Sequence, residues 1–236
     1  MIRLCRQPPE AGNADQYDIT RLTPLPDSPL RGRTVFFLGS SVTNGAASQH
    51  QALPEYFAAR LGCRSIKEAV DGTTLANDAP DSYIQRLLPH LDREAAVDLF
   101  VCQLSTNDAG QHKPLGEIAA GTDPADFDTR TVTGAIQWII ATVGRRWHCP
   151  VVFYTNARFD SPAYDAMVRR LKELQQKWQI GVLDLWSDAS FNAISPQQRA
   201  LYMRDEIHPY RAGYRDWWCP ELERQLLAYL AQNPAR

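Results

Sequence analysis

This sequence of 236 residues has no apolar run long enough to cross a membrane, and its longest apolar runs have the length of β-strands. Its first residues lack the long apolar stretch of a secretory signal. Its five cysteines (5, 63, 102, 149 and 219) are odd in number and lack the paired spacings of a metal site. We therefore expect a cytoplasmic protein with reduced cysteines, no membrane span and no bound metal.

Positive charge is not in excess either. The net charge is −2 and the isoelectric point is near 6.2, so we expect no partner among nucleic acids or anionic membrane surfaces. The turn at residues 39–45 contains no lysine and lacks the Gly-x-x-x-x-Gly-Lys pattern. A phosphate-binding domain is therefore a weak alternative.

The composition provides ample material for a buried core, with 44% hydrophobic and 22% charged residues. Residues 1–31 contain five prolines and little periodicity, and we interpret them as an arm that lies over the domain or contacts a partner. Residues 32–236 have the length of one ordinary domain. A homo-oligomer is compatible with this organisation.

From residue 34 onward, segments typical of strands alternate with segments typical of helices, which indicates an α/β fold. Short, nearly continuous apolar runs predict buried parallel strands at 34–38, 99–104, 151–155 and 180–185. Residues 63–70 are more polar, as expected of an edge strand. We predict a three-layer α/β/α sandwich around a flavodoxin-like, five-stranded parallel sheet with strand order 2-1-3-4-5.

Polar residues follow the first three predicted strands. Ser41 follows the first strand, Gly72 the second and Asn107 the third. Ligands of such sheets bind at the carboxyl ends of the strands, so these residues are expected at one edge. Far downstream, Asp205 precedes His208 by three residues. A serine hydroxyl becomes a good nucleophile when a positioned imidazole takes its proton, so the set is suited to hydrolysis.

In order and spacing, these residues resemble the SGNH (GDSL-like) hydrolase superfamily over roughly residues 32–230. The family's first block, Gly-Asp-Ser followed by a Thr and a Gly, is similar to residues 39–45. Gly72 matches the glycine of the second block, and residues 105–108 resemble the third block, Gly-x-Asn-Asp. Asp205 and His208 match the final Asp-x-x-His block.

The resemblance implies a catalytic site without metal or cofactor. Ser41 would be the nucleophile, His208 the base and Asp205 the residue that orients it. The amides of Ser41 and Gly72 and the side chain of Asn107 would form the oxyanion hole. Glycine at position 72 would allow the backbone to approach the substrate closely.

Two positions depart from the family pattern. Ser40 replaces the usual Asp beside the nucleophile, and Ser105 replaces the usual Gly of the third block. We expect altered hydrogen bonding in these loops more than lost activity.

Each residue also has a structural interpretation. Asn107 is suited to capping the turn after the third strand, and Gly72 to a turn that needs no catalytic role. Asp108 is expected to hold the adjacent loop or a backbone amide. Four residues near the expected pocket are interpreted as solvated loop residues: His112, Lys113, Asn156 and Arg158.

The leading hypothesis is a serine esterase that acts on a small-molecule ester through an acyl-enzyme. A polar pocket rim favours a small, acetyl-like acyl group on a hydrophilic carrier such as a carbohydrate. The expected rim residues are Thr73, Thr74, Asn107, His112 and Arg158. A thioesterase, a lysophospholipase or an acyltransferase with the same triad is the alternative, followed by a non-catalytic binding protein of the same fold.

Overall fold

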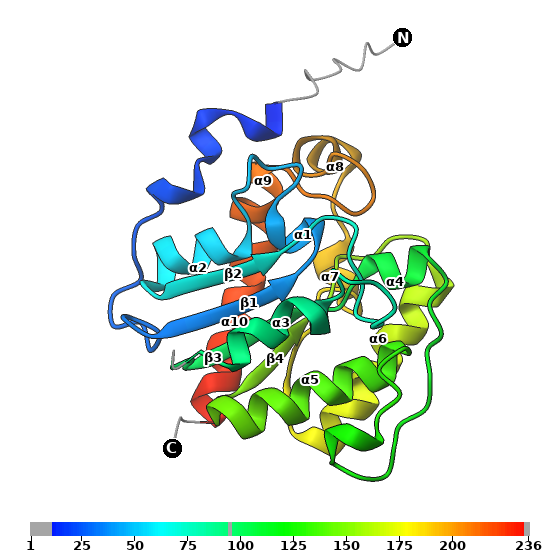
Figure 1. Ribbon diagram of the computed structural model, residues 1–236. Coiled ribbons are helices and arrows are strands. Elements are labelled where there is room, and N and C mark those ends of the chain that lie inside the picture. The colour runs from blue at the N-terminus through cyan, green and yellow to red at the C-terminus, as the bar shows by residue number, and fades with distance from the viewer. Residues whose placement is uncertain (1–10, 94–95, 234–236) are drawn as a thin grey trace.

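The structure, a computed structural model, describes residues 11–93 and 96–233. Its centre is a parallel sheet with the strand order β2-β1-β3-β4-β5 (Figure 1). The predicted α/β/α sandwich and its strand order are confirmed. The strands are β1 (Thr34–Gly39), β2 (Arg64–Ala69), β3 (Leu99–Gln103), β4 (Val151–Tyr154) and β5 (Gly181–Leu183).

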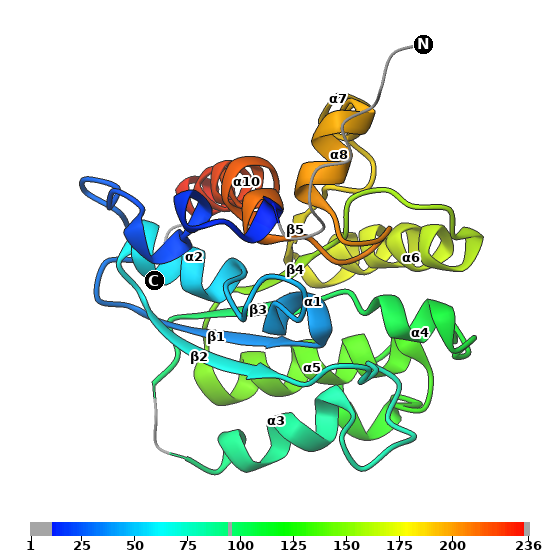
Figure 2. The ribbon, with the colours of Figure 1, turned by 90° about the horizontal axis from the view of Figure 1, so that it is seen from above.

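Helices cover both faces of the sheet, as the view from above shows (Figure 2). One face packs against α2 (Leu53–Leu61) and α10 (Cys219–Gln232). The other packs against α3 (Tyr83–Leu91), α5 (Val132–Trp147) and α6 (Pro162–Trp178). Successive side chains of each inner strand point to opposite helix layers. Since nearly all of them are apolar, both faces of the sheet are apolar.

Shorter helical segments occupy the loops. Several follow the carboxyl ends of the strands or lead into the last helix: α1 (Ser41–Asn44), α4 (Thr106–Gly110), α7 (Ala189–Asn192), α8 (Pro196–Tyr202) and α9 (Arg211–Gly213). A π-helical segment, Tyr214–Trp218, joins α9 to α10. A 3₁₀ turn, Pro124–Asp126, precedes α5.

Local signals in the sequence set several helix boundaries. Gly62 ends α2 in the left-handed conformation, with φ of +71°, as predicted. The Ser161 hydroxyl accepts a hydrogen bond from the Tyr164 N–H and so caps α6, with Pro162 at the first helical position.

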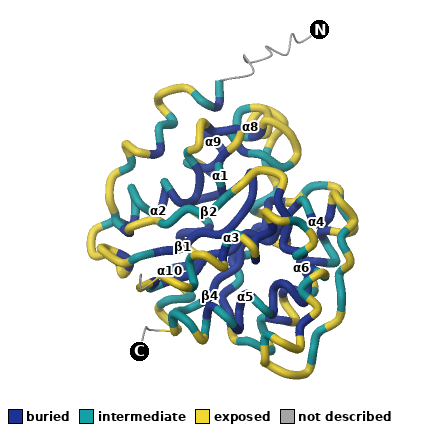
Figure 3. Tube along the Cα trace, in the orientation of Figure 1, coloured by how far each residue is buried: buried dark blue, intermediate teal, exposed yellow. Residues whose placement is uncertain are grey.

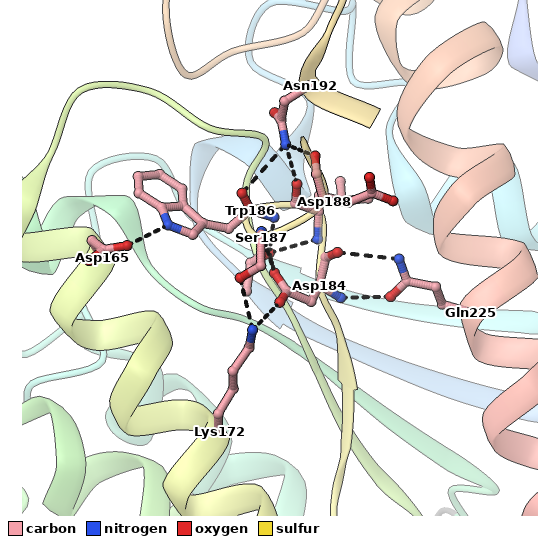
Figure 4. Close-up of polar contacts among 10 residues, drawn as sticks. Asp165, Lys172, Asp184, Trp186, Ser187, Asp188, Asn192 and Gln225 are labelled. Atoms are coloured by element: carbon pink, nitrogen blue, oxygen red, sulfur yellow. Dashed lines mark hydrogen bonds and ion pairs between the residues drawn. The ribbon is translucent and has the colours of Figure 1, made fainter. Parts of the chain in front are cut away.

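Strand β5 is shorter than the predicted run 180–185, because side chains take the backbone groups beyond Leu183. The Asp184 N–H donates to the side-chain oxygen of Gln225 on α10 at 2.7 Å (Figure 4). The N–H groups of Leu185 and Trp186 donate to the Thr155 hydroxyl at 2.9 and 3.0 Å. Buried residues of the apolar run therefore continue to Leu185, although the strand itself ends at Leu183.

Residues 11–33 run along the outside of α2 and end at β1 (Figure 1). They contain three 3₁₀ turns, at Ala11–Asn13, Asp15–Tyr17 and Ile19–Arg21. Ile19 is fully buried in the core on the α2 side, and its N–H donates to the Gln51 side chain at 2.9 Å. The division into an arm and a domain at residue 31 stays a prediction, and part of that arm, residues 1–10, lies outside the described residues.

Burial follows the layers, with the sheet and the inner faces of the helices enclosed and the loops exposed (Figure 3). Strand β2 is the most exposed of the five, in agreement with its prediction as a polar edge strand. In residues 11–93 and 96–233, no helix combines the length and apolarity needed to cross a membrane.

Candidate active site

The turn after β1 presents Ser41 at the carboxyl edge of the sheet. The strand ends at Gly39, and the single-turn helix α1 begins at Ser41, ends at Asn44 and is capped by Gly45, whose φ is +78°. Gly39 has no space for a side chain, because an added Cβ would lie 1.7 Å from the Thr43 hydroxyl oxygen. The close packing of this turn fixes Ser41, which is itself buried.

Ser41, His208 and Asp205 lie in hydrogen-bonding contact, as their types and order predict. The Ser41 Oγ lies 2.8 Å from His208 Nε2. On the other side of the ring, His208 Nδ1 lies 2.9 Å from Asp205 Oδ2 and 3.0 Å from Oδ1. Because Nδ1 faces a carboxylate, its proton stays there and Nε2 presents its lone pair to the serine hydroxyl.

The loop that carries Asp205 and His208 is a tight turn stabilised by its own carboxylate. Asp205 Oδ1 accepts hydrogen bonds from the N–H groups of Ile207 and His208, both at 2.8 Å. Partial burial alone would raise the pKa of Asp205, but these hydrogen bonds and the neighbouring imidazole hold the pKa below its ordinary value. The carboxylate is therefore ionised at neutral pH and orients the ring.

Gly72 and Asn107 lie on the neighbouring loops, after β2 and β3. Gly72 has a φ of +80°, and an added Cβ would meet no atom within 4 Å. Its backbone conformation is therefore what favours glycine there. The Asn107 side-chain amide donates to the Thr73 carbonyl at 2.9 Å, which ties the two loops together. An amide has two N–H groups, so the second remains for another acceptor.

The hydrogen bonds of Ser105 and Asp108 in the third block are structural, one set local and the other to the loop after β2. The Ser105 hydroxyl accepts from the Asn107 and Asp108 N–H groups at 3.2 and 3.4 Å and so caps α4. Asp108 accepts from the Leu75 and Ala76 N–H groups at 2.8 and 2.9 Å, which confirms its predicted structural role. Burial raises the pKa of Asp108 above its ordinary value.

One of the four residues interpreted as solvated is buried, and a second, Lys113, is only partly exposed. Asn156 is fully buried and donates to the Ile207 carbonyl at 3.2 Å, so it supports the loop of His208. Lys113 forms an ion pair with Asp78 at 2.5 Å. His112 and Arg158 are exposed, as expected.

The expected polar rim also changes, because Thr73 and Thr74 are buried. Their hydroxyls donate to the carbonyls of Val70 and Ala76. Instead, the exposed side chain of Asp71, in the turn after β2, lies beside the turn of Ser41. The Asn44 side chain donates to Asp71 at 2.8 Å.

Sequence reasoning missed two polar side chains, the fully buried Gln103 and the mostly buried Arg86. Gln103 ends the apolar strand β3, and its side-chain oxygen accepts hydrogen bonds from the turn that carries Ser41. Arg86 on α3 donates to the Gly39 carbonyl at 2.7 Å and to the Thr73 hydroxyl at 3.0 Å. A polar residue at the end of an otherwise apolar strand was the one signal that marked Gln103 in advance.

The sequence pattern of the GDSL-like lipase/acylhydrolase family matches residues 37–215, and the chain belongs to this family. Solved structures share its fold. A protein from Lactobacillus plantarum has 20% sequence identity and a TM-score of 0.67, over 86% of this chain and 98% of that one. A possible lipase from Chitinophaga pinensis has 16% identity and a TM-score of 0.59, over 86% of this chain and 99% of that one.

No curated protein sequence matched the chain. The family nevertheless defines the class of protein: a carboxylic ester hydrolase of the SGNH, or GDSL-like, type.

Proposed function

We propose that this hydrolase is a serine esterase that works through an acyl-enzyme formed on Ser41. His208 is the general base, Asp205 orients it, and the substrate is an ester of a small, acetyl-like acid with a polar carrier such as a carbohydrate. The observation that carries the proposal is the 2.8 Å contact between Ser41 Oγ and His208 Nε2. This distance is within the range needed for direct proton transfer.

In the first step, the Ser41 oxygen attacks the ester carbonyl while its proton moves to His208 Nε2. The imidazolium is stabilised by the Asp205 carboxylate, which lies 2.9 Å from Nδ1. The proton then passes to the alcohol oxygen as the single bond between the carbonyl carbon and that oxygen breaks, and the alcohol leaves. Water, deprotonated by the same imidazole, hydrolyses the acyl-enzyme and restores Ser41.

The negative oxygen of the tetrahedral intermediate needs donors that are already in place. We assign this role to the backbone N–H groups of Ser41 and Gly72 and to the side-chain amide of Asn107. The bond from Asn107 to the Thr73 carbonyl supports the assignment because it fixes the amide group beside the Gly72 turn. One such donor contributes about 10²–10³-fold to the rate.

Polar surroundings support a small acyl group and a polar carrier. Among the described residues, Val70 and Leu88 are the large hydrophobic residues with substantial exposure, each at 40%. Hydroxyl-rich carriers suit this surface better than long acyl chains.

A cytoplasmic location belongs to the same proposal, because the odd set of cysteines suits a reducing compartment. The triad also serves thioesters, lysophospholipids and acyl transfer. We therefore expect a substrate panel to distinguish esterase, thioesterase, lysophospholipase and acyltransferase activity. It comprises p-nitrophenyl esters from acetate to palmitate, an acetylated sugar, an acyl-CoA and a lysophospholipid, with and without an acceptor alcohol.

The proposal is tested most directly with a fluorophosphonate probe, which reacts with activated serines. We expect labelling of the wild type and an adduct mapped to Ser41. Ser41→Ala should lose both the adduct and about 10⁴-fold of the turnover while keeping its unfolding temperature. Ser28→Ala is the matched control and should keep the adduct, because Ser28 is as buried as Ser41 but lies outside the turn.

Labelling of another serine, or hydrolysis by Ser41→Ala at the rate of the wild type, contradicts the proposal. An unlabelled wild type with no turnover on any ester in the panel supports the binding-protein alternative instead.

A further inference from the structure

The side-chain oxygen of Gln103 is the common acceptor for the turn that carries Ser41. It accepts from the Ser40 and Thr43 N–H groups at 2.9 and 3.2 Å. It also accepts from the hydroxyls of Thr43 and Ser40 at 2.8 and 3.3 Å. Gln103 is fully buried, as are Ser40 and Thr43. These four contacts lie on both sides of Ser41 in the sequence.

The turn depends on this acceptor because it cannot stabilise itself. Helix α1 has four residues, which is far too short to be stable alone. The first N–H groups of any helix have no partner within that helix. In a buried turn these groups need an acceptor from elsewhere in the protein, and Gln103 at the end of β3 provides it.

A second contact fixes which hydroxyl donates in this hydrogen-bond network. The Thr43 hydroxyl lies 2.6 Å from the Tyr154 hydroxyl on β4, and both are buried. Since the oxygen of Gln103 is only an acceptor, the Thr43 hydrogen points to it and the Tyr154 hydroxyl donates to Thr43. The chain Tyr154–Thr43–Gln103 therefore links β4 and β3 to the turn after β1.

Gly39 leaves the space for this arrangement. An added Cβ at position 39 would lie 1.7 Å from the Thr43 hydroxyl oxygen and 2.9 Å from the Gln103 oxygen. Position 40 carries Ser where the related family block has Asp, so the acidic side chain of that block is absent here. The acceptor in this chain comes from the neighbouring strand.

We propose that Gln103 is a positioning residue for the nucleophile: its side-chain oxygen holds the turn so that the Ser41 hydroxyl meets His208 and the Ser41 N–H faces the oxyanion. This inference rests on the proposed role of Ser41 as nucleophile. It predicts that Gln103 acts on the chemical step more than on substrate binding.

The test replaces Gln103 with Leu and with Glu, and uses Gln137 as the matched control. Gln137 on α5 is also fully buried, its side-chain oxygen also accepts a hydrogen bond, from Lys177, and its side-chain nitrogen is unpartnered like that of Gln103. Gln137→Leu therefore reports the effect of losing a buried glutamine away from Ser41.

We expect Gln103→Leu to lower kcat by about 10–100-fold with KM within about twofold, since a displacement of about 1 Å at the reacting atoms costs up to about 100-fold. The rate of fluorophosphonate labelling at Ser41 should fall in parallel. Gln103→Glu keeps an acceptor oxygen and should recover at least about tenfold of the lost kcat at neutral pH. Gln137→Leu should keep kcat within about twofold of wild type, even if its unfolding temperature falls as much as that of Gln103→Leu.

The inference is overturned if Gln103→Leu keeps kcat within twofold of wild type, if Gln137→Leu loses as much, or if Gln103→Glu recovers nothing. If Gln103→Leu does not fold, Thr43→Val removes one of the four contacts, and an unchanged kcat then overturns the inference.

Ser41→Ala in the same assay separates failure of the proposed function from failure of the inference about Gln103. Wild-type turnover by Ser41→Ala ends the proposed function and the inference with it. Loss of turnover in Ser41→Ala together with a fully active Gln103→Leu ends the inference alone.

Discussion

Replacing Asp205 with Asn should stop the reaction while leaving the fold almost untouched. Asp205 Oδ1 accepts from two backbone N–H groups, so the Asn carbonyl oxygen takes that position. The Asn NH₂ group then replaces Oδ2, which lies 2.9 Å from His208 Nδ1. Because a donor now faces Nδ1, the imidazole moves its proton to Nε2, which points at Ser41. In that tautomer His208 cannot accept the serine proton.

The expected loss is large because the general base is removed. The same change in a Ser-His-Asp triad lowers kcat by about 10⁴-fold. That factor corresponds to about 5 kcal/mol of activation free energy. The effect on stability is small by comparison. The Asp205 side chain is 49% exposed, and an ion pair at such a position contributes about 0–1 kcal/mol. For a chain of this size, about 1 kcal/mol shifts the unfolding temperature by about 2–4 °C.

The assay measures kcat on a p-nitrophenyl ester and the unfolding temperature for Asp205→Asn beside Glu206→Gln. Glu206 is exposed in the same loop, so its variant makes the same change of net charge and should keep wild-type turnover. If Asp205→Asn keeps more than about a tenth of wild-type kcat, the orienting role of Asp205 is refuted. A drop in the unfolding temperature well beyond about 4 °C refutes the stability argument instead.

Three further predictions concern stability and packing. Ile19→Ala should lower the free energy of unfolding by about 2–5 kcal/mol, measured in urea, because Ile19 is fully buried; an unchanged midpoint would mean that residues 11–33 fold separately. Gly39→Ala should lower the unfolding free energy by about 1–3 kcal/mol and also lower kcat, because its Cβ meets the Thr43 hydroxyl; wild-type values for both would contradict the packing. Burial alone would raise the pKa of Asp184, but the ammonium of Lys172, 2.6 Å away, helps to hold that pKa below its ordinary value. The carboxylate therefore stabilises the fold above about pH 4, and this stability is lost as the pH falls through the lowered pKa. Asp184→Asn should lower the urea midpoint at pH 7, and the midpoint of this variant should fall less than that of the wild type between pH 4 and 2. An equal fall in both proteins would contradict this.

Much of the fold was predictable because its signals are local. Apolar runs of strand length, separated by helical stripes, specify parallel strands covered on both faces, and Gly62 and Ser161 mark helix ends by their own chemistry. The predicted strand 180–185 was too long for a reason that the sequence does not carry locally. Gln225, about forty residues downstream, takes the N–H of Asp184.

The buried state of Asn156 was also missed, for a similar reason. Nothing in its neighbourhood along the chain indicates that its side chain meets the carbonyl of Ile207. A polar loop residue and a buried support of the His208 loop have the same sequence pattern, and only the contact between Asn156 and Ile207 in the folded chain distinguishes them.

The sequence by itself determined which residue types stand at the edge of the sheet and in which order, because a strand end fixes the position of Ser41 and a three-residue spacing fixes Asp205 relative to His208. Tertiary structure alone decided which partners hold them. The acceptor for the turn of Ser41 comes from β3, and the support for the His208 loop comes from Asn156 in the loop after β4. Buried hydrogen-bonding groups must find partners across the fold, and that choice depends on distances in space that no local pattern encodes.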